Sequence, residues 1–271
     1  MGGVQVAELD ELVMHRAGAP IGDHQMAAPR HDRQPGHQRW TLDASSDHDR
    51  AGLQHFTARE RHAAGGAMRY AGQKCTATSR VIVDRRVVEP FLEKLRMAMA
   101  ALPLGPATDV ACAIGPMITA AARDRVLAAL AADPAEVLAG GTLPDEAAYT
   151  HGNWFAPRIV RFEGTEHPLA QRELFGPVLG LLVADDLEHA LVMANATPYG
   201  LSASLFTRDL GSAMQYLRRI EVGLVRVNGD TTGVDPHAPF GGLKGSSSGS
   251  REQGRAARDF YTEIRTIQIH A

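Results

Sequence analysis

Residues 80–102 read RVIVDRRVVEPFLEKLRMAMAAL, and their pattern decides the fold class. The first five, RVIVD, form a short apolar run that is typical of a buried strand. The residues that follow place an apolar side chain every three or four positions, which predicts an amphipathic helix with one buried face. These apolar residues are Val88, Phe91, Leu92, Leu95, Met99 and Leu102. A strand followed directly by a helix is the first half of a parallel crossover unit.

The same alternation of strand and helix signals continues along the chain. Strands are predicted at residues 176–183, 202–207 and 223–228, and helices at residues 118–131 and directly after the capping residues Asp185 and Asp209. Strands separated by helices of this length imply right-handed crossovers and a buried, mainly parallel sheet. We therefore expect an α/β fold with a mainly parallel sheet and flanking helices.

Residues 1–62 have a different composition from the rest of the chain. They hold seven of the twelve histidines and are broken up by Gly, Pro, Asp, Ser and Gln. Such a segment buries too little apolar surface to offset its chain entropy, so we expect it to be poorly ordered. A short helix around residues 4–15 is the alternative. The histidine spacings match no compact ligand set, and no metal site is expected.

Composition excludes several classes of protein. The net charge of −3 over 271 residues gives no electrostatic footprint for nucleic acid or for an anionic membrane. No apolar run approaches the roughly 18–20 residues of a membrane span, and residues 1–20 lack the apolar core of a secretory signal. The two cysteines, Cys75 and Cys112, have neither the spacing of a disulfide framework nor that of a zinc site. A cytoplasmic location is the expectation.

Cys75 is the strongest candidate for chemistry. It lies in YAGQKCTATSR, residues 70–80, just ahead of the first predicted strand. Gly72 permits close backbone approach, so the thiol can stand at a loop corner near main-chain N–H groups. A thiolate there can attack a carbonyl carbon, and its own N–H can bind the resulting oxyanion. The alternative is a small buried residue, which is also the interpretation for Cys112 among its apolar neighbours.

Three further segments stand in order behind Cys75: ELFGPV at residues 173–178, NATPYGLSASLFTRD at residues 195–209, and GLVRVN through PFGGLKGSS to REQG at residues 223–254. Together with GQKC, their order and separations resemble the aldehyde dehydrogenase superfamily over about residues 64–269. The ending KGSSSGSREQG is similar to the branch that contains the 2-oxoglutarate semialdehyde dehydrogenases. The resemblance implies a catalytic domain at residues 63–256, a C-terminal intersubunit strand at residues 257–271, and a non-family segment at residues 1–62.

The resemblance also implies roles for single residues. Cys75 matches the nucleophile that adds to a small aldehyde as a thiohemiacetal and then becomes a thioester. Glu173 matches the carboxylate that binds the nicotinamide ribose of NAD or NADP, and Phe175 matches the aromatic residue beside that ribose. Asn228 and Phe240 match positions on the substrate-entry side. The alternatives are a solvated charge at a strand end for Glu173 and tight-turn geometry for Asn228 and the turn that holds Phe240.

The last residues suggest a partner. The run from Tyr261 to Ile269 alternates apolar and polar residues like the family's intersubunit strand. It implies a homo-oligomer, or pairing with a related subunit through residues 261–269. An ordinary edge strand is the alternative.

Two parts of the family pattern do not occur in these residues. The family places a dinucleotide-binding domain ahead of the cysteine, with a Pro-Trp-Asn motif for the oxyanion and a Glu-Leu-Gly-Gly-Lys motif for the general base. Neither motif occurs in the 271 residues, and residues 1–62 hold no glycine-rich dinucleotide loop. We therefore expect a truncated enzyme that is inactive or very weak alone. A non-catalytic remnant that self-associates and a thiol esterase are the alternatives.

Overall fold

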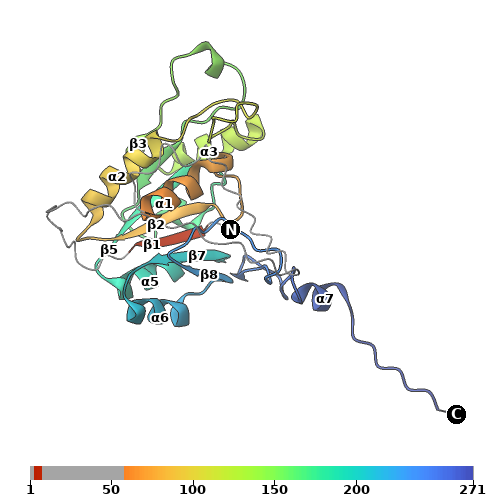
Figure 1. The fold of residues 1–271 in the computed structure, drawn as a ribbon. Helices are drawn as coiled ribbons and strands as arrows, with labels where there is room; N and C mark the ends of the chain where they lie inside the picture. Colours follow the sequence, from red (N-terminus) through yellow and green to blue (C-terminus); the bar gives the residue numbers. More distant parts are fainter. Residues whose placement is uncertain (1–2, 8–57, 271) are drawn as a thin grey trace, which may run out of the picture.

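A computed structural model describes residues 3–7 and 58–270 of the chain, and within them one sheet dominates (Figure 1). Its order is β3-β4-β5-β2-β1-β7-β8. Neighbouring strands are parallel except for the antiparallel pair of β3 and β4. The strands are β1 (Gly3–Ala7), β2 (Thr78–Asp84), β3 (Glu136–Gly140), β4 (Arg158–Arg161), β5 (Val178–Ala184), β7 (Ser202–Phe206) and β8 (Leu224–Val227). The prediction of an α/β fold with a mainly parallel sheet is confirmed.

Helices cover both faces of this sheet. Figure 1 shows α1 and α2 above it and α5 and α6 below it. The helices are α1 (Ala58–Met68), α2 (Val88–Ala100), α3 (Ala120–Ala132), α4 (Pro168–Gln171), α5 (Leu187–Asn195), α6 (Leu210–Arg219) and α7 (Ala256–Tyr261), with short 3₁₀ turns at Arg69–Gly72 and Ala147–Tyr149. A separate antiparallel pair joins β6 (Tyr199–Gly200) to β9 (Leu243–Lys244).

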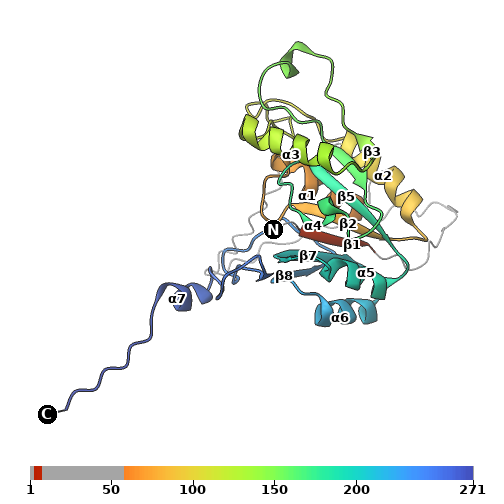
Figure 2. The same ribbon diagram turned by 180° about the vertical axis from the view of Figure 1, so that it is seen from behind.

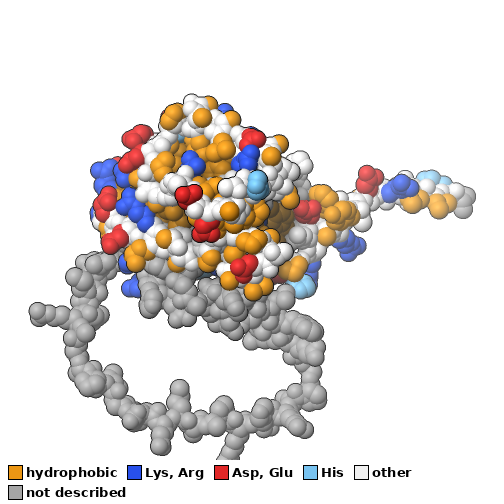
Figure 3. All heavy atoms as spheres, turned by 90° about the horizontal axis from the view of Figure 1, so that it is seen from above, with side chains coloured by type: hydrophobic (Ala, Val, Ile, Leu, Met, Phe, Trp, Pro, Cys, Tyr) orange, Lys and Arg blue, Asp and Glu red, His pale blue; other side chains and the backbone are white. Residues whose placement is uncertain are grey.

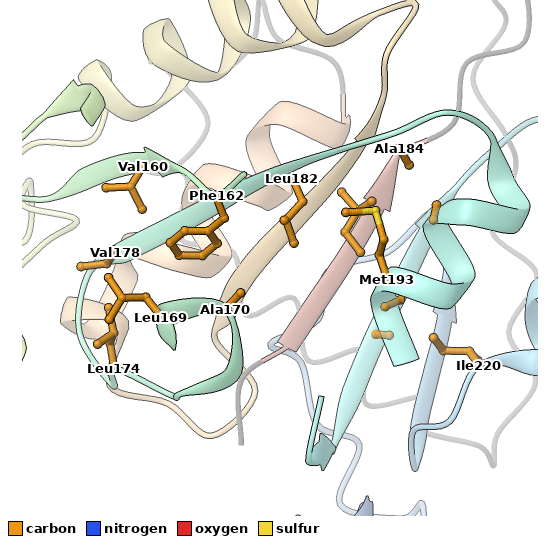
Figure 4. Packing of buried hydrophobic residues seen from close by; sticks show 14 of the residues in the cluster. Val160, Phe162, Leu169, Ala170, Leu174, Val178, Leu182, Ala184, Met193 and Ile220 are labelled. Atoms are coloured by element: carbon orange, nitrogen blue, oxygen red, sulfur yellow. The ribbon is translucent and has the colours of Figure 1, made fainter. Parts of the chain in front are cut away.

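Two apolar clusters form the core, one on each face of the sheet. Because side chains alternate along a strand, Val81 and Val83 of β2 face the cluster of α1 and α2, while Ile82 faces the opposite cluster. Figure 4 shows this second cluster, which includes Leu182 of β5 and Met193 of α5. The fully buried apolar run of β2 and β5 is what a parallel sheet covered on both faces requires.

β1 corrects the prediction for the N-terminal segment. This strand lies in the middle of the sheet, paired in parallel with β2 on one side and β7 on the other. The helix suggested around residues 4–15 is therefore wrong for residues 4–7. The position of this strand is set by its neighbours, because the main-chain groups of β2 and β7 require partners. The expectation of poor order for residues 8–57 concerns residues outside those that the structure describes.

Two predicted boundaries also shift. The side chain of Asp186, not that of Asp185, caps α5 by accepting the N–H of His189 at 2.8 Å. Asp209 caps α6 as predicted. α1 begins at Ala58, so helical structure crosses the boundary predicted at residue 63.

The C-terminal end differs from the expected strand. Tyr261 belongs to α7, so the strand predicted to begin there, or at residue 257, starts inside a helix. Residues 262–270 have no strand partner in the described part of the chain, and Ile264 and Ile269 are 102% and 90% exposed. Figures 1 and 3 show this tail projecting away from the body. An extended segment pairs only when another strand is beside it, so pairing with a second chain stays a prediction.

Candidate active site

Cys75 lies in the turn that connects α1 to β2. The chain reverses through three consecutive left-handed residues, Tyr70, Ala71 and Gly72, with φ of 54°, 53° and 64°. The N–H of Ala77 then donates to the carbonyl of Lys74 at 3.0 Å and closes the turn around Cys75. Left-handed backbone at non-glycine residues is strained, and such strain concentrates at functional sites. The turn leaves the thiol half-buried at the amino end of β2.

Gly72 brings this turn against the segment ELFGPV. A Cβ atom at Gly72 would lie only 2.2 Å from the carbonyl oxygen of Gly176 and 2.8 Å from the nitrogen of Pro177. The close backbone approach predicted for Gly72 is therefore confirmed. It places the cysteine turn in direct contact with the loop that carries Glu173 and Phe175.

Four of the residues predicted for the site line two pockets to which the cysteine turn contributes. Cys75 and Phe240 line one pocket, together with Ser246. Glu173 and Phe175 line the other pocket, whose wall also includes Gly72 and Lys74 of the turn. Residues of this turn therefore contribute to the walls of both pockets. Cys75 lines one pocket itself and is adjacent in the chain to Lys74, which lines the other.

Glu173 and Phe175 offer groups of the kinds that contact the ribose of a nicotinamide cofactor. Leu174 is buried at 8% exposure and anchors the loop, while Glu173 on one side is half-buried and Phe175 on the other is exposed. Phe175 has a left-handed backbone with φ of 53°, which turns the chain at this point. A carboxylate accepts hydrogen bonds from ribose hydroxyls, and an exposed ring offers a packing surface. The residues that are present match those needs.

Asn228 lies elsewhere. Its side-chain oxygen accepts the N–H of Thr207 at 3.0 Å, and its amide donates to the carbonyl of Thr207 at 2.8 Å. These bonds join the carboxyl ends of β7 and β8, whereas Cys75 precedes the amino end of the parallel strand β2. The structure does not bring Asn228 to the pocket of Cys75, and its contacts agree with the alternative of a turn-forming residue.

The segment of residues 230–232, which we call the return segment, follows Asn228 and reaches the cysteine turn. Asp230 accepts the N–H of Thr232 at 2.8 Å, and the hydroxyls of Thr231 and Thr78 are 2.8 Å apart. The hydroxyl of Thr76, next to Cys75, donates to the carbonyl of Thr232 at 3.2 Å. Burial raises the pKa of Asp230, but hydrogen bonds from His62 and Thr232 lower it more. The sequence carries no spacing signal for these contacts, because they join residues about 150 positions apart.

Gln73 ties the turn to a third part of the chain. Its side-chain oxygen accepts the N–H of Ile118 at 2.9 Å, in the loop that leads into α3. The turn of Cys75 is therefore held from three sides, by ELFGPV, by the return segment and by this loop. Its position is fixed by tertiary contacts as well as by its own residues.

Similarity to known proteins identifies the family of this chain. Residues 56–267 match the description "Aldehyde dehydrogenase family". The chain belongs to this family. The match begins before the boundary predicted at residue 63 and includes α1. An alpha-ketoglutaric semialdehyde dehydrogenase of Bacillus subtilis is 42% identical over 207 residues, which are 75% of this chain and 42% of the relative.

Other members of the aldehyde dehydrogenase family show similar coverage. A betaine aldehyde dehydrogenase of Sinorhizobium fredii is 37% identical over 215 residues, covering 76% of this chain and 43% of its own. The solved structure of HpcC from Thermus thermophilus has a TM-score of 0.72 and 34% identity, covering 78% of this chain and 42% of that chain. The chain thus spans less than half the length of the relatives it matches.

One solved relative carries a cofactor. A betaine aldehyde dehydrogenase from Staphylococcus aureus, determined with NAD+ and a modified cysteine, has a TM-score of 0.71 and 28% identity, covering 75% of this chain and 41% of that chain. Among residues 3–7 and 58–270, no helix has the length and apolar character to cross a membrane. The same residues contain no group of three His, Cys, Asp or Glu side chains arranged to hold a metal ion.

Proposed function

We propose that this chain supplies the thiol-bearing part of an aldehyde dehydrogenase that oxidises a small aldehyde to a carboxylic acid. The observation that carries the proposal is that Cys75 lines a pocket with Phe240 and is adjacent to Lys74, which lines a second pocket with Glu173 and Phe175. Family membership supports the same chemistry. The two free thiols, Cys75 and Cys112, fit a reducing compartment, and we place the reaction in the cytoplasm.

Cys75 acts as the nucleophile in this proposal. Its thiolate sulfur bonds to the aldehyde carbon, and the carbonyl electron pair moves onto the oxygen to give a thiohemiacetal. The main-chain N–H of Cys75 donates to that oxygen in this proposal. Loss of the carbon-bound hydrogen as hydride leaves a thioester on Cys75. Water then attacks the thioester carbon, releases the carboxylic acid and restores the thiol.

Glu173 and Phe175 hold the cofactor in this proposal. The carboxylate of Glu173 accepts hydrogen bonds from ribose hydroxyls, and the exposed ring of Phe175 packs beside that ribose. NAD or NADP, when bound, accepts the hydride with its two electrons. Complexes of relatives with NAD+ support this assignment.

We assign the substrate to the class of short aldehydes, with 2-oxoglutarate semialdehyde as the first choice. Two relatives named for that semialdehyde, at 42% and 38% identity, support it. Phe240, on the pocket of Cys75, is the residue that faces the substrate side. Residues 262–270 supply the surface for self-association or for pairing with a related subunit, since their isoleucines are exposed.

The oxidation depends on groups beyond those assigned here. Neither the Pro-Trp-Asn motif nor the Glu-Leu-Gly-Gly-Lys motif occurs in the 271 residues. A general base contributes about 10²–10⁴ in rate and an oxyanion donor about 10²–10³. We therefore propose that the 271-residue chain alone forms NADH slowly or not at all, while Cys75 keeps its acyl-transfer chemistry.

The experiment compares two reactions of the purified chain. The first is a burst of nitrophenol from 4-nitrophenyl acetate, and the second is NADH formation from 2-oxoglutarate semialdehyde and NAD+. The proposal expects a burst that is lost in Cys75→Ser and kept in Cys112→Ser, with little NADH. Steady ester turnover without NADH under any condition would favour the thiol esterase instead.

A chimera completes the test of the oxidation. The preceding half of the Bacillus subtilis relative, joined ahead of residue 58, is expected to restore NADH formation that depends on Cys75. A folded chimera that forms no NADH, or that forms it equally well as Cys75→Ser, would contradict the proposed function. If the chain shows no burst and the chimera forms no NADH, the non-catalytic remnant that self-associates becomes the better account.

A further inference from the structure

Arg80 is a buried cation without a described partner. It lies on β2 with 4% of its surface exposed, and its Nη1 atom has no hydrogen-bond partner in the part of the chain that the structure describes. Burial lowers the pKa of Arg80 to about 10, so the guanidinium still carries its charge at neutral pH. A buried charge is costly unless another charge or hydrogen-bond acceptor lies against it.

A small pocket adjoins this guanidinium. Arg80 lines it together with Arg172, Glu173, Thr197 and Tyr199. Leu169 and Ala170 of α4, labelled in Figure 4, supply its apolar wall. Because Arg80 and Ile82 are two positions apart on β2, both side chains face the α4 side of the sheet. The cavity and the unpartnered charge therefore lie together.

The charges around this pocket favour an anion. Its lining holds two arginines against one carboxylate, Glu173. It shares Arg172 and Glu173 with the neighbouring pocket of Phe175, where Lys74 adds a third positive charge. The hydroxyl of Tyr199 is a further donor.

We propose that this pocket binds one small anion against the guanidinium of Arg80. The space open within it is about 10 Å³, room for one water-sized group and not for a whole metabolite. The ligand is therefore a halide ion, or a small acid that places one oxygen of its carboxylate head in this space. Charge-assisted hydrogen bonds from a planar guanidinium suit both. The site is separate from the thiol of Cys75 and does not rest on the proposed function.

The test uses the full 271-residue chain and chloride as the probe. The chloride NMR signal is expected to broaden when the protein is added, and the site is expected to saturate as the chloride concentration rises. The signal should narrow again when sodium formate competes for the site. Displacement by formate at lower concentration than chloride assigns a carboxylate head, and displacement only at higher concentration assigns a halide. Either result supports an anion site.

Arg80→Gln and Arg218→Gln are the matched variants, since Arg218 is an exposed arginine on α6. Arg80→Gln is expected to lose chloride affinity by about 10- to 100-fold, in line with the loss of a charged hydrogen bond, while Arg218→Gln binds like the wild type. Removing an unpaired buried charge is also expected to raise the melting temperature without chloride. Arg80→Met serves if the glutamine variant does not fold. Wild-type protein without saturable broadening, or a folded Arg80 variant with unchanged affinity, would overturn the proposal.

Discussion

The replacement Gly72→Ala tests whether the cysteine turn is held against the ELFGPV loop. The added Cβ would lie 2.2 Å from the carbonyl oxygen of Gly176, whereas ordinary contacts begin at 3.4 Å. The two backbone segments must therefore separate by about 1.2 Å, the difference between these two distances. The neighbour in the way is backbone, which cannot rotate aside as a flexible side chain does.

Two energies add at this position. Alanine in the left-handed region that Gly72 occupies costs about 1–2 kcal/mol, and forcing extra volume into a packed site costs about 1–3 kcal/mol. The sum of about 2–5 kcal/mol is a large part of the 5–15 kcal/mol that stabilises a typical domain. Displacing Cys75 by about 1 Å is expected to slow its acylation about 100-fold.

Urea unfolding and the nitrophenyl acetate burst measure the two effects. The unfolding midpoint of Gly72→Ala is expected to fall by about 1 M or more. Gly164→Ala is the matched control, because its added Cβ meets nothing within 4 Å. If Gly72→Ala unfolds at the control's midpoint and shows the wild-type burst, the packing of the turn against Gly176 does not position Cys75.

Three further replacements test the fold around the site. Asp84→Asn removes a buried carboxylate that accepts from Arg86 at 2.9 Å and whose pKa Arg86 lowers; it should destabilise the chain by about 1–3 kcal/mol at pH 7. Because the pKa of Asp84 is lowered in the folded state, its ionised carboxylate stabilises the fold above the unfolded pKa near 3.9, and this stabilisation is lost as the pH falls through the folded pKa. The urea midpoints of the variant and the wild type should therefore converge below about pH 4. A constant difference between the two midpoints down to pH 2 would contradict this. Val6→Pro removes a ladder N–H from the interior strand β1 and should destabilise the chain by about 1–3 kcal/mol, the cost of a buried hydrogen-bonding group left without its partner; an unchanged melting temperature would mean that β1 does not pair as described. Gly180→Ala would bring a Cβ 2.0 Å from the ring of Phe162, so its destabilisation should shrink when combined with Phe162→Ala, and simple additivity would count against the contact.

The sequence predicts those elements whose residues carry a strong local period. The strand at residues 80–84 and the amphipathic helix behind it appear as β2 and α2, and the strands at residues 202–207 and 223–228 appear as β7 and β8. An unbroken run of apolar residues is typical of a parallel strand that is buried on both faces. By contrast, β1 and β4 are not predicted, because their place in the sheet depends on the strands beside them, β2 and β7 for β1 and β3 and β5 for β4.

The sequence predicts those site residues that belong to short motifs. It does not predict the residues whose position in the site depends on tertiary contacts. Cys75, Glu173 and Phe175 follow from short motifs, and the structure places them around one turn. The end of the sheet at which Asn228 lies depends on the strand order, which no local pattern contains. The bond between Thr76 and Thr232 depends on how the return segment crosses the sheet.

Peptide mass spectrometry after a short exposure to 4-nitrophenyl acetate tests the role of Cys75 most directly. The chain holds two free cysteines, so each molecule carries its own control. Cys75 stands in the pocket with Phe240, while burial and the nearby Asp109 raise the pKa of Cys112 and suppress its thiolate. We predict an acetyl group on the peptide of Cys75 and none on that of Cys112. Acetylation of Cys112 alone, or equal acetylation of both, would contradict the assignment of Cys75 as the nucleophile.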